Sequence, residues 1–194
     1  MAIEPALSHD RQYFDSMYGG DADPWGFDSR FYERRKYELT LAALPRQRYV
    51  RAVEPGCANG AFTEMLAERC DELVAFDFVE DAVARARCRV AAATHVTVTC
   101  AEFPLWWPAG TGDLVVWSEV AYYLTERGFT TAIEGLKRWL RPGGHLVAVH
   151  YTGETDYPLS GLETHRRLDE VPFLDTAFAA VDERFVMQVW SRAA

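Results

Sequence analysis

The sequence predicts an α/β fold in which a doubly wound, mostly parallel sheet of seven strands lies between two layers of helices. Three observations support this prediction. From Tyr49 onward, short and continuous apolar runs alternate with helical patterns, which is typical of parallel strands covered on both faces. The last two strand-like runs are joined by the tight Asp182-Glu183 turn, which indicates an antiparallel hairpin at the sheet edge. The first 45 residues carry helical patterns and loops instead.

Length and composition predict a single domain over residues 1–194. The chain is 49% hydrophobic and 25% charged, and a chain of this length buries roughly 70% of its unfolded surface. Residues 1–45 are expected to form a helical segment or lid, and residues 49–194 the α/β core. This composition excludes wholesale disorder and collagen, and no apolar run approaches the roughly 20 residues of a membrane-spanning helix.

The net charge limits the binding partners that we expect, and the cysteine content indicates whether metal sites or disulfides are expected. The formal net charge of −9 argues against nucleic acid or an anionic membrane as partner, because both attract basic surfaces. The four cysteines match no zinc spacing and form no C-x-x-C pair, so we expect no metal and mostly buried, reduced thiols. The sequence does not open with a basic region and an apolar stretch, which favours a cytoplasmic protein. The oligomeric state is left open.

Two helices are expected in the N-terminal segment, the first from Asp10 to Tyr18. Ser29 is the predicted N-cap of the second helix, which Pro45 ends. The triplet Arg34-Arg35-Lys36 is interpreted as a solvated face of that helix, with a clamp for a carboxylate as the alternative. The apolar residues of the helix are expected to share one broad face: Phe31, Tyr32, Tyr37, Leu39, Leu41 and Leu44.

Strands and helices alternate in the rest of the chain. Five parallel strands are expected at residues 50–54, 72–77, 95–100, 112–117 and 145–150, with a turn at 141–144 before the fifth. The helices between them are expected at residues 61–69, 79–92 and 125–140. A short helix near residues 161–168 precedes the hairpin strands at 176–181 and 184–190.

A turn bracketed by glycines ends the first of these strands, with the sequence Glu54-Pro-Gly-Cys-Ala-Asn-Gly60. Gly56 and Gly60 permit positive φ angles and a close approach of a ligand to the backbone. The helix that follows offers unpaired N–H groups. Asp77 ends the next strand 21 residues after Gly56, where a carboxylate can accept both hydroxyls of a ribose. Open α/β sheets bind ligands at this carboxyl edge.

The spacing of the turn decides between two nucleotide cofactors. A dinucleotide pyrophosphate requires G-x-G-x-x-G, whereas this turn reads E-x-G-x-A-x-G. The negative charge of Glu54 would repel a pyrophosphate but suits a ligand that carries an ammonium group. S-adenosylmethionine has a ribose, an adenine and an amino-acid tail and no phosphate. It therefore fits the turn better than a nicotinamide dinucleotide.

On these motifs the chain resembles the class I S-adenosylmethionine-dependent methyltransferases, whose fold is Rossmann-like. The segment from Glu54 to Gly60 is similar to their first motif, although Ala58 stands where many members have glycine, and Asp77 matches their second. Residues 101–103, 113–120 and 140–144 match later motifs, so the resemblance covers residues 49 to about 150. It implies methyl transfer that leaves S-adenosylhomocysteine as product. The cofactor contacts that it implies are Glu54, Gly56, Cys57, Ala58, Gly60, Asp77, Glu102 and Ser118.

Motifs near both ends carry a narrower resemblance to the NodS-like branch, named for a nodulation N-methyltransferase that acts on the free amine of a chitooligosaccharide. These motifs are Asp23-Pro24-Trp25, Ser29, Tyr32-Glu33-x-x-Lys36, the segment 118–124 and Gln188-Val189-Trp190. Relatives in this branch methylate other small molecules, including at oxygen. The resemblance therefore implies a small-molecule acceptor, either an amine or, alternatively, a hydroxyl or acid oxygen.

Aromatic side chains add further candidate contacts. Trp25 lies in a polar loop and is a candidate lid over the cofactor, or an anchor for the N-terminal segment. Phe78 and Phe103 are candidates to flank the adenine, with packing in the core as the alternative. The substrate pocket is expected to be shaped by Tyr13, Tyr122 and Tyr123, each of which can instead be half-buried filler.

Glu119 and His150 are the catalytic candidates, because they lie at the carboxyl ends of the fourth and fifth strands. Methyl transfer is an in-line displacement, so holding the acceptor about 3 Å from the methyl carbon supplies much of the acceleration. An amine must be neutral to attack, and an imidazole or a partly desolvated carboxylate can take its proton. His165 is a further candidate to touch the substrate. For each of the three, the alternative is a hydrogen bond outside the site.

Two other functions remain open on the sequence. One is a non-catalytic protein that binds the cofactor as a sensor or partner subunit. The other is a nicotinamide-dependent reductase, which the missing G-x-G-x-x-G disfavours.

Overall fold

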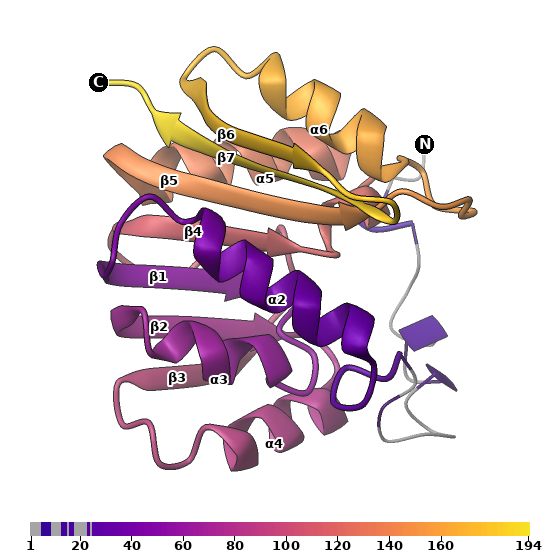
Figure 1. Cartoon of the computed structure of the whole chain (residues 1–194), viewed down its shortest axis with the longest axis vertical. Helices are drawn as coiled ribbons and strands as arrows, with labels where there is room; N and C mark the ends of the chain where they lie inside the picture. Colours follow the sequence, from indigo (N-terminus) through magenta and orange to yellow (C-terminus); the bar gives the residue numbers. More distant parts are fainter. Residues whose placement is uncertain (1–4, 9–12, 15, 18–22, 24) are drawn as a thin grey trace.

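A seven-stranded sheet in the order β3-β2-β1-β4-β5-β7-β6 forms the centre of the computed structural model (Figure 1). The structure describes residues 5–8, 13, 14, 16, 17, 23 and 25–194. The strands are β1 (Tyr49–Pro55), β2 (Cys70–Asp77), β3 (Val96–Cys100), β4 (Gly112–Ser118), β5 (Leu140–Tyr151), β6 (Leu174–Val181) and β7 (Phe185–Arg192). The helices are α2 (Phe31–Ala43), α3 (Ala61–Ala67), α4 (Glu80–Arg89), α5 (Glu126–Trp139) and α6 (Gly161–Asp169), with a 3₁₀ turn η1 (Ala121–Tyr123).

Strands β1 to β5 pair in parallel, and β7 pairs antiparallel with both β5 and β6. The predicted fold class and the terminal hairpin are therefore confirmed. After β1 the chain continues to one side of the sheet through β2, and from β4 it continues to the other side. This reversal between β1 and β4 leaves a crevice at their carboxyl ends, which is the usual ligand position in such sheets.

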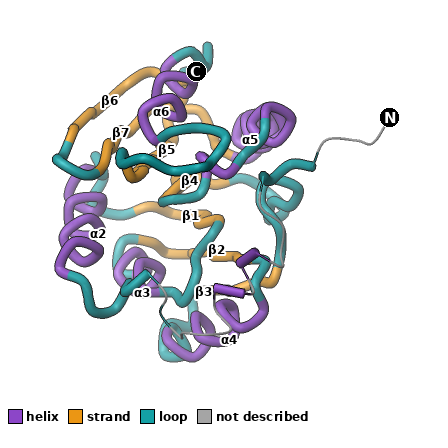
Figure 2. The backbone as a smooth tube through the Cα atoms, turned by 90° about the vertical axis from the view of Figure 1, so that its right-hand side faces the viewer, coloured by secondary structure: helices purple, strands orange, loops and turns teal. Residues whose placement is uncertain are grey.

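Helices cover both faces of the sheet, with α2 and α3 on one side and α5 on the other (Figure 2). Alternate residues along each strand supply the two cores, as the two-residue period of a strand requires. In β4, Val115 and Trp117 pack with Leu136 of α5. The intervening Leu114 and Val116 pack with the layer that contains Phe62 of α3. Because both faces are apolar, the strands are the continuous apolar runs that the sequence shows.

Two local predictions are wrong. Ser29 does not cap α2, because the N-cap is Arg30 and its side chain makes no capping hydrogen bond. The turn expected at residues 141–144 lies within β5, which begins at Leu140 and pairs with β4 across a register shift between Gly112 and Leu114. Of the helix predicted from Asp10 to Tyr18, Tyr13, Phe14, Ser16 and Met17 are helical, and its other residues lie outside the described ones.

Helix α2 buries polar as well as apolar side chains, so the predicted broad apolar face is only partly correct. Tyr37 and Leu44 are buried, and Tyr32 and Leu41 pack against the same core, but Leu39 is exposed. The buried residues of the helix itself are Glu33, Lys36, Tyr37 and Thr40, whereas Phe31 is 78% exposed. The spacing of three and four residues places these four side chains on one side of the helix. The helix turns this face inward because Lys36 forms ion pairs beneath it, at the end of β4.

In the described part of the chain, no helix has both the length and the apolar character that crossing a membrane requires.

We predict that Gly60→Ala destabilises the fold more than Gly143→Ala. Both glycines have positive φ, +80° and +72°, which costs alanine roughly 1–2 kcal/mol. A Cβ at Gly60 would also stand 2.9 Å from the Cα of Ala86 in α4, whereas at Gly143 the nearest atom is 3.9 Å away on Arg46. Denaturant titration of both variants measures the difference. Equal losses would mean that α3 and α4 are not in close contact at this point.

Candidate active site

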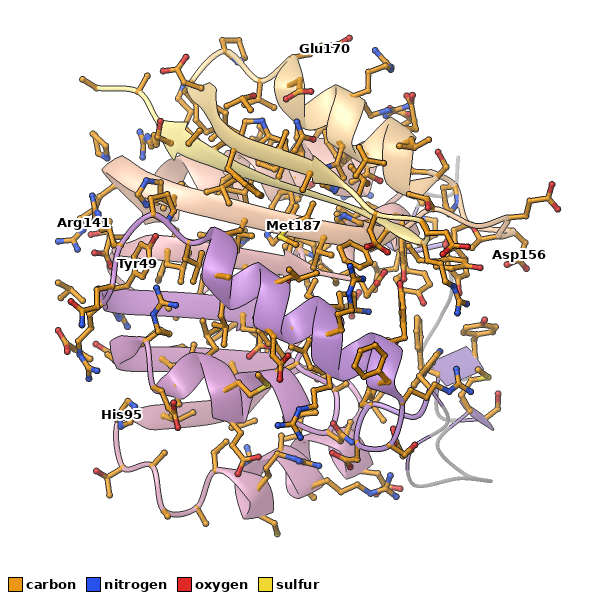
Figure 3. The ribbon with its side chains drawn as sticks, viewed as in Figure 1. Tyr49, His95, Arg141, Asp156, Glu170 and Met187 are labelled. Carbon is orange, nitrogen blue, oxygen red and sulfur yellow. The ribbon has the colours of Figure 1, made fainter. Side chains whose placement is uncertain are left out.

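A cavity of about 370 Å³ opens at the carboxyl edge of the sheet, where β1 and β4 diverge. Figure 2 looks onto this edge, and Figure 3 shows Asp156 beside it, with Tyr49 and Arg141 at the opposite edge. The residues predicted from sequence that line the cavity are Trp25, Glu54, Gly56, Cys57, Ala58, Asp77, Phe78, Phe103, Ser118, Glu119, Tyr122 and Tyr123. Those that do not line it are Tyr13, Gly60, Glu102, His150 and His165.

The glycine turn after β1 forms the base of one half of the cavity. Gly56 has a φ of +69°, and a Cβ there would stand 3.0 Å from the side chain of Val120. Asp77, at the end of β2, holds this turn with both carboxylate oxygens. Its Oδ2 accepts a hydrogen bond from the N–H of Ala58 at 3.0 Å, and its Oδ1 accepts one from Val79 at 3.0 Å.

Glu54 contributes a buried carboxyl group beside the turn. Its exposed fraction is 2%, and its Oε2 has no hydrogen-bond partner in the described part of the chain. Burial, reinforced by the charge of Asp77, raises the pKa of Glu54 to about 8, and the nearby Thr63 hydroxyl opposes this shift only in part. A buried carboxyl oxygen without a partner costs free energy, which a cationic ligand group would recover. The residue therefore fits a ligand that presents an ammonium group here.

Lys36 forms a buried ion-pair network in the other half of the cavity. Its side chain is 1% exposed, and its Nζ lies 2.7 Å from Glu119 Oε1 and 2.8 Å from Glu33 Oε2. The ring of Tyr32 lies 5.0 Å from the same Nζ, which adds a cation–π contact. Burial acts to lower the pKa of Lys36, but the two carboxylates outweigh it, so the pKa is raised and Lys36 stays charged.

The interpretation of Lys36 as part of a solvated face is therefore wrong, although it holds for Arg34, whose side chain is 77% exposed. The spacing Glu33-x-x-Lys36 is the signal that indicates a paired lysine, because residues three apart on a helix are neighbours. The sequence does not reveal that Glu119, 83 residues further along, completes the network.

Glu119 points into the cavity because its backbone is in the left-handed region, with a φ of +53° directly after β4. Such a conformation in a non-glycine residue costs free energy and persists only when its surroundings hold it. The end of β5 supplies this support. The Glu119 N–H donates to the carbonyl of Val149 at 2.9 Å, and Glu119 Oε2 accepts from the N–H of Tyr151 at 2.9 Å.

Tyr122, Tyr123 and Tyr157 form a tyrosine wall on one side of the cavity. The rings of Tyr123 and Tyr157 lie 4.4 Å apart, and the Tyr123 hydroxyl donates to the Tyr157 hydroxyl at 3.3 Å. Burial raises the pKa of Tyr122 and of Tyr123. Both phenols therefore stay protonated near neutral pH, where they act as hydrogen-bonding groups and not as bases.

Other lining residues were missed in the sequence because their positions depend on the packing of distant segments. They are Leu7, Phe14, Phe27, Arg30, Tyr32, Glu33, Tyr37, Tyr151, Thr155, Tyr157 and Arg184, among others. Trp25 and Phe27 lie stacked at 5.5 Å and both line the cavity, which agrees with the expected position of Trp25 over the ligand site. Tyr13 lies behind Phe14, whose ring it meets edge-on at 5.1 Å.

His150 and His165 are not brought to the cavity, which corrects the expectation that they touch substrate. The His150 side chain is fully buried, with its Nε2 accepting from the N–H of Ala121 at 3.2 Å. Burial, together with the charges of His165 and Lys36, lowers the pKa of His150 well below its ordinary value. Burial also lowers the pKa of His165 to about 4. Neither imidazole is placed to take a proton from a ligand in the cavity.

Comparisons with known proteins show which family this chain resembles. The family model of Nodulation protein S (NodS) matches residues 17–152. Nodulation protein S of Rhizobium tropici is 37% identical over 147 residues, which are 75% of this chain and 62% of that protein. The match thus spans less than two thirds of that relative's length.

Two solved structures are also similar. A chain from Pseudomonas syringae is 43% identical with a TM-score of 0.75, covering 84% of this chain and 100% of its own. The N-methyltransferase NodS from Bradyrhizobium japonicum WM9, in complex with S-adenosyl-L-homocysteine, is 26% identical with a TM-score of 0.84, covering 94% of this chain and 98% of its own.

We predict that Lys36→Met destabilises the protein by about 3–5 kcal/mol, because it leaves two buried carboxylates without their shared cation. Denaturant titration measures this loss.

Arg34→Met, on the exposed side of the same helix, is the matched control. It removes only a surface pair with Glu38, and we expect a change within about 0.5 kcal/mol. If both variants lose the same small free energy of unfolding, the ion pairs of Lys36 contribute no more to stability than a surface ion pair does.

Proposed function

This chain belongs to the NodS family, and on that premise we propose that it transfers a methyl group from S-adenosylmethionine to a small-molecule amine. The observation that carries the proposal is the buried Glu54 carboxyl group, whose Oε2 lacks a partner beside the Gly56 turn. A cavity that held a phosphate-bearing nucleotide would not place an acidic group at this point. The cofactor has an ammonium group and no phosphate.

The residues around the turn fit the separate parts of the cofactor. Glu54 would hold the ammonium group, Asp77 the ribose hydroxyls, and Phe78 and Phe103 the faces of the adenine. The backbone from Gly56 to Ala58 lines the cavity between them. Bound in this way, the cofactor supplies an activated methyl group on a sulfonium centre. Ser118 and Trp25 line the same cavity and are proposed as further contacts.

An amine acceptor suits the charge of the second half of the cavity. Glu33 and Glu119 share the cation Lys36, so these three side chains carry one excess negative charge, while Arg30 and Arg184 also line the cavity. The rings of the tyrosine wall add negative faces, which attract an ammonium group. A small protonated amine is thus drawn in, and a lone pair becomes available when it loses its proton.

Glu119 is the proposed catalytic residue. Its carboxylate lines the cavity, where it contacts the Lys36 ammonium group, the Tyr151 N–H and the Tyr122 hydroxyl. An acceptor N–H that donates to Glu119 would have its nitrogen lone pair oriented for attack. Because Lys36 stabilises the negative charge of Glu119, we assign Glu119 to orienting the amine, with the proton leaving to solvent. Holding the acceptor in line supplies most of the acceleration.

Residues 1–45 are proposed to act as a lid that belongs to the same single domain as residues 49–194. Leu7, Phe14, Trp25 and Phe27 all line the cavity, which supports this role. Their apolar side chains would exclude water from the reacting groups, as closing segments do in other enzymes.

Thermal unfolding with each candidate cofactor is the first test. S-adenosylhomocysteine at about one hundred times its dissociation constant should add roughly 2.7 kcal/mol, a Tm shift of about 5–11 °C for this length. NAD should give no shift. A panel of small amines and matched hydroxyl and carboxylate compounds, assayed for transfer of labelled methyl, then identifies the acceptor atom. Cofactor binding with transfer only to oxygen would replace the amine assignment, and binding without any transfer would favour a sensor.

We predict that Glu54→Gln weakens S-adenosylhomocysteine binding by about 10- to 150-fold, since a charge-assisted hydrogen bond contributes about 1.5–3 kcal/mol. The pKa of Glu54 is about 8 in the free protein, so binding of an ammonium group near pH 7 should ionise Glu54 and release a proton. Affinity of the unmodified protein should therefore rise as the pH increases toward 8. Calorimetry in buffers of different ionisation enthalpy measures the proton.

Glu64→Gln, on the exposed side of α3, is the control and should change neither affinity nor proton release. If Glu54→Gln still releases a proton on binding, Glu54 is not the group that faces the ammonium.

A further inference from the structure

A chain of hydrogen-bonded side chains runs from the tyrosine wall to the terminal hairpin, through the buried His150, His165 and Gln188 to the exposed Asp169. His150 Nδ1 lies 3.1 Å from His165 Nε2, and His165 Nδ1 lies 2.7 Å from Gln188 Oε1. Gln188 Nε2 donates to Asp169 Oδ1 at 3.1 Å. The chain thus joins β5, α6 and β7, and it begins at Ala121, the first residue of η1.

Only one arrangement of protons satisfies every link. The backbone N–H of Ala121 can only donate, so His150 Nε2 must be unprotonated and its proton must lie on Nδ1. His150 then donates to His165 Nε2, which must also be unprotonated, and His165 Nδ1–H donates to Gln188 Oε1. The Gln188 amide in turn donates to the carboxylate of Asp169. All donors therefore point the same way, and adding a proton to either imidazole breaks a link.

Asp169 anchors the far end of this chain. Besides Gln188 it accepts the indole N–H of Trp190 at 2.9 Å and the hydroxyl of Thr176 at 3.1 Å. A carboxylate that accepts several hydrogen bonds is held firmly, and buried networks with every group satisfied are rigid. The end of this hydrogen-bond chain at Ala121 is therefore connected, through His150, His165 and Gln188, to a firmly held carboxylate.

The near end holds the segment that carries the tyrosine wall. Glu119 and Ala121 are bound by three consecutive residues of β5: Val149 through its carbonyl, His150 through its ring and Tyr151 through its N–H. The His150 ring also packs on Tyr122, with ring centroids 5.1 Å apart. Of these three residues of β5, only His150 uses its side chain. Its imidazole holds both the backbone of η1 at Ala121 and the ring of Tyr122 in the tyrosine wall.

We propose that His150 and His165 are positioning residues that set the acceptor-binding geometry of Glu119 and the tyrosine wall, without touching the acceptor. The proposal rests on the function proposed above. The cofactor half of the cavity is formed mainly by the ends of β1 and β2, with Phe103 and Ser118 beside them. The hydrogen-bond chain instead binds Ala121, in the segment after β4. Disturbing it should therefore change acceptor binding and leave cofactor binding nearly unchanged.

Two substitutions at one position test the hydrogen-bond requirement. His165→Met removes both the acceptor and the donor, whereas His165→Gln retains one of each. We expect His165→Met to raise KM for the acceptor at least 10-fold, with kcat changed less and S-adenosylhomocysteine affinity within about 2-fold. His165→Gln should recover most of this loss. His95→Met, at the opposite edge of the sheet (Figure 3), should match the unmodified protein.

Nitrogen NMR of the imidazoles tests the proton arrangement without any substitution. Both histidines should be neutral with the proton on Nδ1 between pH 5.5 and 7.5, and His165→Met should change the His150 signals. Over the same range kcat should show no titration that depends on His165. A proton on His150 Nε2, or a kcat that falls below about pH 6.5 only when His165 is present, would overturn the proposal.

The KM values of the variants also decide whether the two histidines position the acceptor site. Equal KM values in His165→Met and the unmodified protein, or equal losses in His165→Met and His165→Gln, would reject positioning by this chain. If His165→Met does not fold, Gln188→Met breaks the next link and should raise KM in the same direction. Failure of the unmodified protein to methylate any acceptor would instead count against the proposed function, while the NMR result still decides the proton arrangement.

Discussion

The ion pair between Lys36 and Glu119 is the interaction on which the carboxyl edge of the sheet depends. A lysine that is 1% exposed stays charged only because two carboxylates lie within 2.8 Å of its Nζ. This requirement explains why α2 turns a polar face inward and leaves Phe31 in solvent. It also brings residues from α2 and the end of β4 to one point, with Tyr151 of β5 completing the contact. The cavity lies between α2, the end of β4 and the end of β5.

The titratable groups around this network are placed to bind and orient ligands and not to transfer protons. Glu54 is a carboxyl group held largely protonated until a cation arrives, because burial raises its pKa to about 8. Glu119 is paired with Lys36, and burial raises the pKa of the phenols of Tyr122 and Tyr123, which stay protonated. His150 and His165, whose imidazoles would ordinarily titrate near neutral pH, are buried, and burial lowers the pKa of each. Such a site holds and orients its ligands and leaves no strong base beside them, as suits a displacement at an already activated methyl group.

Most of the fold, and many of the residues that line the cavity beside Gly56, could be predicted from sequence because they depend on local patterns. Parallel strands covered on both faces are continuous apolar runs, and the turn from Glu54 to Gly60 sits between a strand and a helix. The acceptor half could not be predicted in the same way. Lys36 looked solvated because its partner Glu119 lies 83 residues away. His150 looked catalytic because its position at the end of β5 is known from sequence, whereas the direction of its ring is not.

The sequence by itself determined the α/β class, the order of its elements and the chemistry of the turn between β1 and α3, since these follow from periodicity and from residues that adjoin along the chain. Only the tertiary structure decided which polar groups are buried and what they face. Burial and long-range pairing turn Lys36 into the centre of an ion-pair network and turn His150 and His165 inward, away from the cavity. The physical reason is that the free energy of a charged or titratable group depends on its desolvation and its partners, and both are properties of the assembled fold.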